Sequence, residues 1–200
     1  MKTPEKNPDA LQPMDSLTGQ IKTTDAFDLS RGMPRFASHW VVFALLSVSA
    51  LIFFWQLGEG SLSDWDEAIY AQIAKEMVQG GDWLTPHFGF QPLFHKPPLL
   101  MWCTAVLYQL WGVNEFAARA ASALSGMALI IVIYLTGKIV YDARAGFFAA
   151  VILLTSAQVV YSARIGTTDI MLTLWIWLAI YAYLRVSRGD AKWWLVVGTS

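Results

Sequence analysis

Four long charge-free apolar runs limit what this chain can fold into more than any other feature. They cover residues 40–57, 120–137, 145–163 and 170–184, and an α-helix needs about 20 residues to cross the hydrocarbon of a bilayer. Charged residues make up only 14% of the 200, against about 25% in soluble domains. The sequence therefore predicts an all-α integral membrane protein, with spans near 38–57, 116–138, 145–164 and 168–186.

The two ends of the chain differ from these runs. Residues 1–35 are polar and have no hydrophobic period, which is typical of a disordered tail, here expected in the cytoplasm. The apolar run that begins at Trp193 stops at Ser200, so a fifth span at 193–200 is expected to be incomplete. We therefore expect the N-terminal part of a longer protein, inactive in isolation. The net charge of −1 gives no support to nucleic-acid binding, and the single Cys103 excludes an internal disulfide.

The apolar segment 97–111 decides on which side of the membrane the later residues lie. Its core, 99–111, has 13 residues, and this is about 20 Å of helix against about 30 Å of hydrocarbon. Short cytoplasmic loops collect Lys and Arg. If the segment does not cross, the basic residues of the later loops share one side with the N-terminus: Lys138, Arg144, Arg185, Arg188 and Lys192. We therefore predict a re-entrant or interfacial helix there, an external loop at 59–114, and Asp169 on the external side.

The external loop concentrates acidic and aromatic residues. An apolar stripe at i+4 spacing predicts an interfacial helix over 65–79 that a pair of glycines ends: Trp65, Ile69, Ile73, Met77, Gly80 and Gly81. Asp66 and Glu67 fall in its first turn, where the helix dipole favours anions, and capping-box spacings start at Ser63 and Asp64. The local pattern alone favours helix caps over catalytic groups for both carboxylates.

Lys96 is followed directly by two prolines, which hold it in an extended backbone where the chain meets the membrane. Such a lysine either extends to a lipid headgroup or binds the phosphate of a lipid substrate. Asp169 is expected on the same side as Asp66, so two carboxylates and a lysine could surround a lipid-linked phosphate. His95 is a loop histidine of a kind that is usually solvated and only sometimes a ligand.

Five segments, in their order and spacing, resemble a known family: WDEAIYAQIAKEM, GDWLTP, FHKPPLLMW, GVNEFAARAASAL and ARIGTTDIMLTLW. Over about residues 40–200 the chain is similar to the polyprenyl-phosphate-dependent membrane glycosyltransferases of the GT-C fold. Within that family it most resembles the aminoarabinose transferases that modify lipid A, with protein O-mannosyltransferases as more distant relatives. The resemblance implies a multi-span helical bundle with external juxtamembrane helices and, in the complete enzyme, a periplasmic C-terminal domain.

The resemblance also implies roles for individual residues. Asp66 and Asp169 match the family's catalytic acids, and Lys96 matches the lysine of the K-P-P segment that binds the donor phosphate. Glu67 and Tyr70 would support them. Asp66 would orient or deprotonate the acceptor, Lys96 would stabilise the departing phosphate, and Asp169 would position Asp66, a sugar amine or a divalent cation.

Two positions depart from the family's pattern. His95 stands where relatives often carry Glu or Asp, so a divalent metal site would either use an imidazole ligand or be lost. Ile69 stands where relatives often carry Arg, which weakens any expectation of a second phosphate-binding cation there.

The activity that the resemblance implies is inverting transfer of a sugar from a polyprenyl-phosphate donor to a lipid A-type phosphate or hydroxyl. It would take place at the external face of the bacterial inner membrane, among membrane lipids. Transfer to a protein Ser or Thr is one alternative, and a non-enzymatic transporter or scaffold is another. Transporters place ionisable groups near mid-bilayer, whereas the centres of the expected spans carry no charge.

Overall fold

The computed structural model describes residues 35–193 apart from 63–64, 90 and 94–95. Seven α-helices, two short strands and a 3₁₀ helix follow one another in this part of the chain. Their bounds are α2 Arg35–Phe54, α3 Trp65–Gly80, β1 His87–Phe88, β2 Gln91–Pro92, α4 Leu99–Trp111, α5 Glu115–Val140, α6 Ala143–Thr155, α7 Ala157–Arg164, α8 Asp169–Ser187 and η2 Ala191–Trp193. The predicted all-α class is confirmed, with one antiparallel pair of two-residue strands in which Phe88 lies opposite Gln91.

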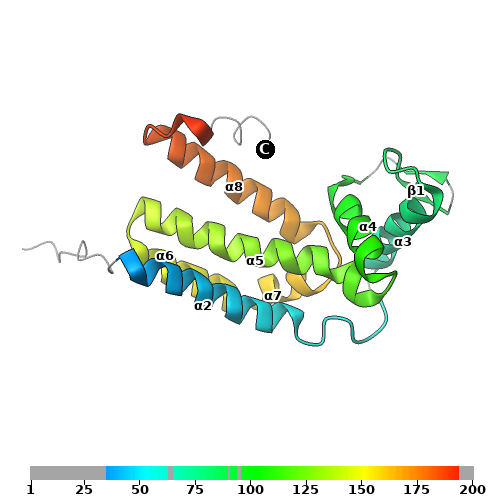
Figure 1. Cartoon of the computed structure of the whole chain (residues 1–200), viewed down its shortest axis with the longest axis horizontal. Coiled ribbons are helices and arrows are strands. Elements are labelled where there is room, and N and C mark those ends of the chain that lie inside the picture. Colours follow the sequence, from blue (N-terminus) through cyan, green and yellow to red (C-terminus); the bar gives the residue numbers. More distant parts are fainter. Residues whose placement is uncertain (1–34, 63–64, 90, 94–95, 194–200) are drawn as a thin grey trace, which may run out of the picture. The chain divides into compact units, whose positions relative to one another are not determined.

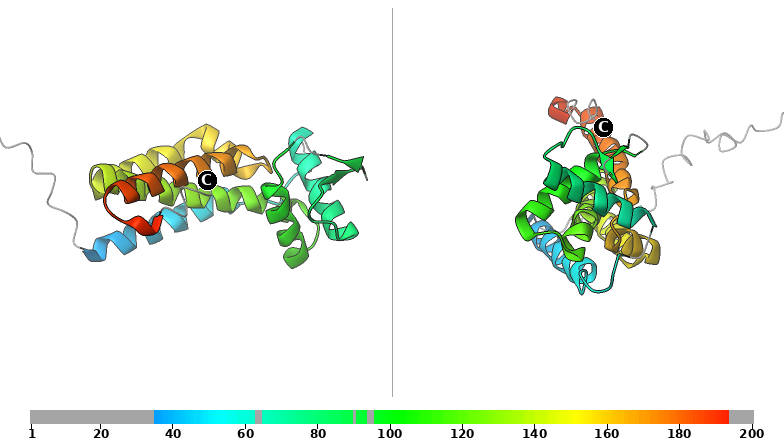
Figure 2. Two further views of the ribbon diagram at one scale, coloured as in Figure 1. Left: turned by 90° about the horizontal axis from the view of Figure 1, so that it is seen from above. Right: turned by 90° about the vertical axis from the view of Figure 1, so that its right-hand side faces the viewer.

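Helix α5 is the central element, and it packs against α2, α4, α6, α7 and α8 (Figures 1 and 2). Its start is fixed by Asn114, whose side chain accepts a hydrogen bond of 2.8 Å from the backbone N–H of Ala117. Its end approaches α6 closely, since a Cβ on Gly146 would collide with the carbonyl oxygen of Tyr134 and one on Gly137 would lie 2.6 Å from the Cα of Gly146. Small residues therefore bring α5 and α6 together, as in many membrane bundles.

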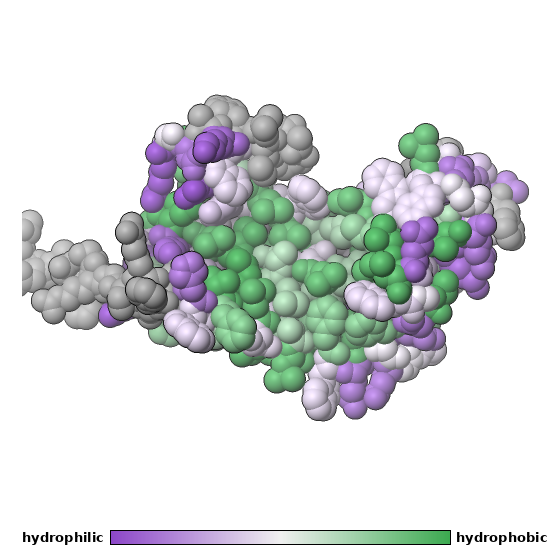
Figure 3. All heavy atoms as spheres, viewed as in Figure 1, coloured by the Kyte–Doolittle hydropathy of each residue, from purple (hydrophilic) through white to green (hydrophobic). Residues whose placement is uncertain are grey.

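Two helices, α5 and α8, are long and apolar enough to cross a membrane. Figure 3 shows apolar side chains over the middle of the bundle and hydrophilic ones gathered at its two ends. The chain is an integral membrane protein. Which side of the membrane each loop faces stays a prediction, as do the limits of the individual spans.

The run 145–163, expected as one span, forms two helices that together are long and apolar enough for one broken span or a re-entrant loop. Helices α6 and α7 are bent by 65° at the residue between them, Ser156, which has an extended backbone with φ −68° and ψ 121°. Next to it, the hydroxyl of Thr155 donates to the carbonyl oxygen of Val151 at 2.9 Å. Hydroxyls that bond back to the preceding turn bend helices, so the break is made without proline.

Helices α3 and α4 pack on each other at one end of α5. The predicted interfacial helix over 65–79 matches α3, and Gly81 follows it with φ 73°. Along the apolar stripe, Ile73 and Met77 are buried in the protein and Trp65 is 82% exposed, and the interfacial position of the helix stays a prediction. Segment 97–111 forms the 13-residue helix α4, which is among the shorter apolar helices.

A short hairpin lies between α3 and α4 and is fastened to both. Asp82 Oδ1 accepts hydrogen bonds of 3.1 Å from the backbone N–H groups of Leu84 and Thr85, and these bonds, that to Thr85 first, lower the pKa of the Asp82 carboxyl. Trp102 of α4 donates its indole N–H to the carbonyl of Trp83 at 2.6 Å. These contacts hold the loop 82–93 beside the two helices.

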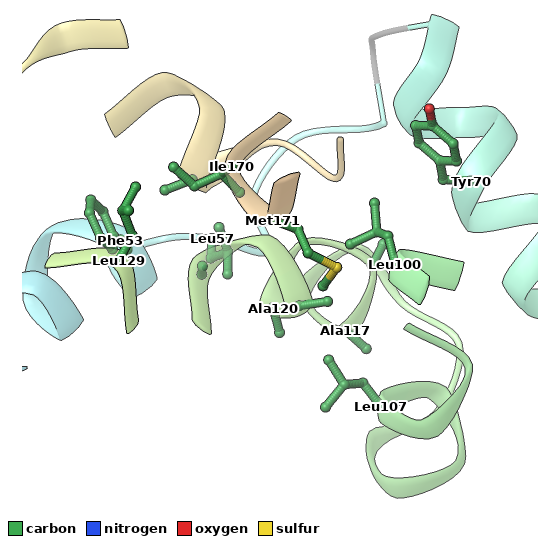
Figure 4. Packing of buried hydrophobic residues seen from close by; sticks show 14 of the residues in the cluster. Phe53, Leu57, Tyr70, Leu100, Leu107, Ala117, Ala120, Leu129, Ile170 and Met171 are labelled. Carbon is green, nitrogen blue, oxygen red and sulfur yellow. The ribbon is translucent and has the colours of Figure 1, made fainter. Parts of the chain in front are cut away.

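The buried core continues from the bundle into the α3–α4 end (Figure 4). Leu100 of α4, Met171 of α8 and Ala120 of α5 all belong to it, and their side chains gather where the three helices meet (Figure 4). Helix α4 therefore packs against the start of α5, close to the start of α8, and α3 packs on α4.

Candidate active site

Asp66 and Lys96 form an ion pair between the first turn of α3 and the loop before α4. Lys96 Nζ lies 3.1 Å from Asp66 Oδ1, and the side chains are 35% and 47% exposed for Lys96 and Asp66, respectively. The ammonium also lies 5.4 Å from the ring centroid of Tyr70, a buried residue of α3. The hydrogen bond to Asp66, followed by the interaction with Tyr70, raises the pKa of the Lys96 amine. Lys96 is thus a fixed, protonated cation that remains open to solvent.

An apolar pocket lies between the start of α4 and the N-terminal end of α8, and Pro97, the residue after Lys96, is part of its wall. The pocket has a volume of about 120 Å³. Its lining is almost wholly apolar: Pro97, Leu99, Leu100, Thr168, Met171, Leu172 and Trp175. A cation that directly precedes the wall of an apolar pocket in the chain suits a ligand that has an anionic head and a hydrocarbon chain.

Glu67 points into the protein and is 1% exposed. Its Oε1 lies 2.7 Å from Nε of Arg119 in α5, whose side chain is 9% exposed, and Oε2 lies 3.4 Å from Nη2. Oε1 also accepts the backbone N–H of Gly166 at 3.0 Å. The local pattern was therefore a poor guide to this residue, because Glu67 joins three parts of the fold through its side chain.

Arg119 is the main site residue that the sequence did not identify. Besides Glu67, its guanidinium donates to four backbone carbonyls of the segment between α2 and α3: those of Leu57 and Glu59 at 3.0 Å, of Ser61 at 3.1 Å and of Gly60 at 3.5 Å. The available signal was an arginine among alanines, FAARAA, inside an otherwise apolar helix. Such an intramembrane or interfacial charge usually has a partner.

Tyr108 of α4 is a buried residue near the carboxylates of Glu67 and Glu115. Burial, together with the negative charges of Glu115 and Glu67, raises the pKa of Tyr108 to about 12. Its phenol is therefore neutral at physiological pH, so it adds no charge beside Glu67.

Asp169 is the first residue of α8 and lines a groove between α5, α7 and α8. This groove has a volume of about 200 Å³, and its polar lining consists of Gln158, Ser162, Asp169 and Thr173. Within the described residues, no hydrogen bond or ion pair joins Asp169 directly to Asp66 or Lys96. The structure thus brings Asp66, Lys96 and Tyr70 into direct contact, and the role of Asp169 beside them stays a prediction.

The expected metal ligand, His95, lies outside the described residues. Within the part of the chain that the structure describes, no three His, Cys, Asp or Glu side chains group as a metal site would require. A divalent cation therefore stays a prediction.

The sequence is similar to a known family and to several of its curated members. A family profile for dolichyl-phosphate-mannose-protein mannosyltransferases matches residues 95–200. The chain belongs to this family. Among curated relatives, the undecaprenyl phosphate-alpha-4-amino-4-deoxy-L-arabinose arabinosyl transferase of Pseudomonas savastanoi is 35% identical over 161 residues, covering 78% of this chain and 30% of that protein. That of Aeromonas hydrophila is 36% identical over 124 residues, or 62% and 23% of the two chains.

The family's fold is seen in a solved structure as well. ArnT from Cupriavidus metallidurans, in a crystal structure bound to undecaprenyl phosphate, has a TM-score of 0.73 and 32% identity, covering 80% of this chain and 30% of ArnT. Its apo structure also scores 0.73, with 31% identity. The expected resemblance to the GT-C aminoarabinose transferases is confirmed. The chain spans about 30% of the length of these relatives.

Proposed function

We propose that this chain is part of a membrane glycosyltransferase that moves a sugar from a polyprenyl-phosphate donor to a lipid A-type acceptor at the periplasmic face of the bacterial inner membrane. The observation that carries the proposal is the Lys96–Asp66 pair, which combines a cation and a carboxylate, together with the apolar pocket that Pro97, the residue after Lys96, helps to line. The names of the relatives, arabinosyl transferases that use undecaprenyl phosphate, support the same donor class. The undecaprenyl phosphate bound to ArnT does so too.

In the proposed reaction, Lys96 binds the donor phosphate and Asp66 accepts a proton from the acceptor. The donor phosphate would pair with Lys96, with its first isoprenoid units in the pocket behind Pro97. Its arrival would release the Asp66 carboxylate from Lys96, so that Asp66 can accept the proton of an acceptor hydroxyl. The acceptor oxygen forms a bond to the anomeric carbon while the bond from that carbon to the phosphate oxygen breaks. The electron pair leaves with the phosphate, Lys96 stabilises the new negative charge, and the anomeric configuration inverts.

Transfer to a protein Ser or Thr is the second candidate. The profile that matches residues 95–200 is named for protein mannosyltransferases, and an alcohol acceptor would need Asp66 as base in the same way. The acceptor is therefore decided by the assay. Asp169 would position Asp66, a sugar amine or a divalent cation, Glu67 takes no part in the proton transfer, and His95 stays a predicted metal ligand.

The test is a transfer assay on the full-length protein in detergent, with a polyprenyl-phosphate aminopentose as donor and either lipid A or a Ser/Thr peptide as acceptor. Lys96→Gln should weaken donor binding, and Asp66→Asn should lower kcat by about 10²- to 10⁴-fold. The matched control is Asp82→Asn, an exposed carboxylate of the same loop whose partners are backbone N–H groups. Unchanged transfer in both site variants would refute the assignment.

A further inference from the structure

The buried pair Glu67–Arg119 ties together the segments that carry the site. Glu67 is the neighbour of Asp66 on α3, and Arg119 belongs to the central helix α5. The same guanidinium also donates hydrogen bonds to backbone carbonyls of the segment that leads into α3, including those of residues 57, 59 and 61. The position of the first turn of α3 is therefore set from α5 through one side chain.

The second end of this connection is the loop between α7 and α8. Glu67 accepts the backbone N–H of Gly166, three residues before Asp169, and the hydroxyl of Ser122 in α5 donates to the carbonyl of Thr167 at 3.1 Å. A Cβ on Gly166 would lie 3.2 Å from the carbonyl oxygen of Ala118 and 3.3 Å from Cγ of Glu67. The loop therefore packs tightly against both α3 and α5 at Gly166.

We propose that Glu67 and Arg119 are positioning residues: their buried ion pair fixes the Asp66 carboxylate relative to Lys96 and to the start of α8. The inference rests on the proposed function. Glu67 is almost fully buried while Asp66 is half exposed, so Glu67 holds the turn and Asp66 faces the substrate. Displacement of a reacting group by about 1 Å can cost about 10² in rate, which makes the fixing of this turn as consequential as the carboxylate itself.

Glu67→Gln is the informative variant, because it keeps the size of the side chain and removes the charge. Arg119 would still donate to its four backbone carbonyls, so the protein should fold. The matched control is Glu76→Gln, a second buried acid of α3, which accepts from Gln72 at 2.7 Å and from the N–H of Gly89 at 3.0 Å. Glu76 joins α3 to the hairpin through the N–H of Gly89.

The assay uses the full-length enzyme and reports kcat per folded molecule, donor KM, and the Kd for undecaprenyl phosphate. Glu67→Gln should lower kcat about 10²-fold with donor KM and Kd changed less than about threefold, because Lys96 is kept. Hydrogen exchange of the segment 164–170 should rise in this variant only. Glu76→Gln should keep kcat. A purely structural role would lower the folded yield and leave kcat per folded molecule at the wild-type value, and that result overturns the proposal.

Two outcomes separate this proposal from the proposed function. If wild-type enzyme does not transfer sugar from the donor, or if Lys96→Gln is without effect, the proposed function fails. If both behave as expected and folded Glu67→Gln keeps wild-type kcat, only the positioning role fails. Should Glu67→Gln not fold, Glu67→Asp decides, since it keeps the charge but shortens the side chain: a folded protein with lowered kcat supports positioning, and wild-type kcat refutes it.

Discussion

Replacing Arg119 by Met should be among the most destabilising single changes in the described part of the chain. Glu67, which is 1% exposed, would lose the cation at 2.7 Å and keep only the N–H of Gly166 at 3.0 Å. Four backbone carbonyls of the segment 57–61 would lose the Arg119 donor as well. Leaving one member of a buried ion pair without its partner costs about 3–5 kcal/mol.

We therefore expect Arg119→Met to lower the free energy of unfolding by about 4 kcal/mol, or almost 10³-fold in the folding equilibrium constant. The double variant Arg119→Met/Glu67→Gln should be less affected than Arg119→Met alone, because no uncompensated charge is left in the interior. Neighbouring residues in one network couple by about 0.5–3 kcal/mol, and we expect at least about 1 kcal/mol of recovery in the double variant.

The measurement is equilibrium unfolding of the full-length protein in detergent, followed by tryptophan fluorescence, for wild type, both single variants and the double variant. The comparison of the double variant with Arg119→Met decides the question, since it removes the effect of the lost arginine packing. If the two single costs simply add in the double variant, the pair is not coupled and the electrostatic reasoning is wrong.

Three further predictions concern other contacts. The hydrogen bond to Asp66 raises the pKa of Lys96. The contribution of the Lys96 cation to phosphate binding is therefore complete below the ordinary lysine pKa of about 10.4 and is lost only as the pH rises through the higher pKa of the folded protein. The affinity for undecaprenyl phosphate, measured by titration, should stay constant between about pH 7 and 9. Gly146→Ala should destabilise the bundle by about 1–3 kcal/mol, because the new Cβ meets the carbonyl of Tyr134, with thermal unfolding as the readout. The pKa of Asp82 is lowered by its hydrogen bonds, so its contribution to the stability of the hairpin is complete above about pH 3.9 and is lost as the pH falls through the lower pKa of the folded protein. Hydrogen exchange of the hairpin should become faster in that acidic range. Asp82→Ala should abolish this pH dependence.

Local features of the fold could be predicted from the sequence. Helix α3 begins at Trp65 and ends at Gly80 because an apolar repeat and a Gly pair act within a few residues of each other. The long apolar runs likewise indicated α5 and α8. In the site, Asp66 and Lys96 could be grouped because each stood at a membrane-proximal end of its segment.

Features made by distant contacts were missed. The bend at Ser156 has no proline or glycine to announce it, since it depends on backbone angles and a local hydroxyl bond. The partner of Glu67 is Arg119, 52 residues along the chain, and only the packing of α3 on the end of α5 brings them together. Asp169 was grouped with the ion pair because both were expected on one side of the bilayer, and its role beside them stays a prediction.

Asp66 and Glu67 illustrate why residue type alone does not assign a role. Consecutive helix positions differ by about 100°, so a helix that lies on the end of a bundle turns one of the two carboxylates outward and the next one inward. The outward acid is half exposed and pairs with Lys96, an interaction that a phosphate can replace. The inward acid meets an arginine whose planar fork also holds the backbone. The exposed pair can exchange partners during a reaction cycle, whereas the buried pair cannot do so without unfolding the turn, and this difference is what suits Asp66 to chemistry and Glu67 to its support.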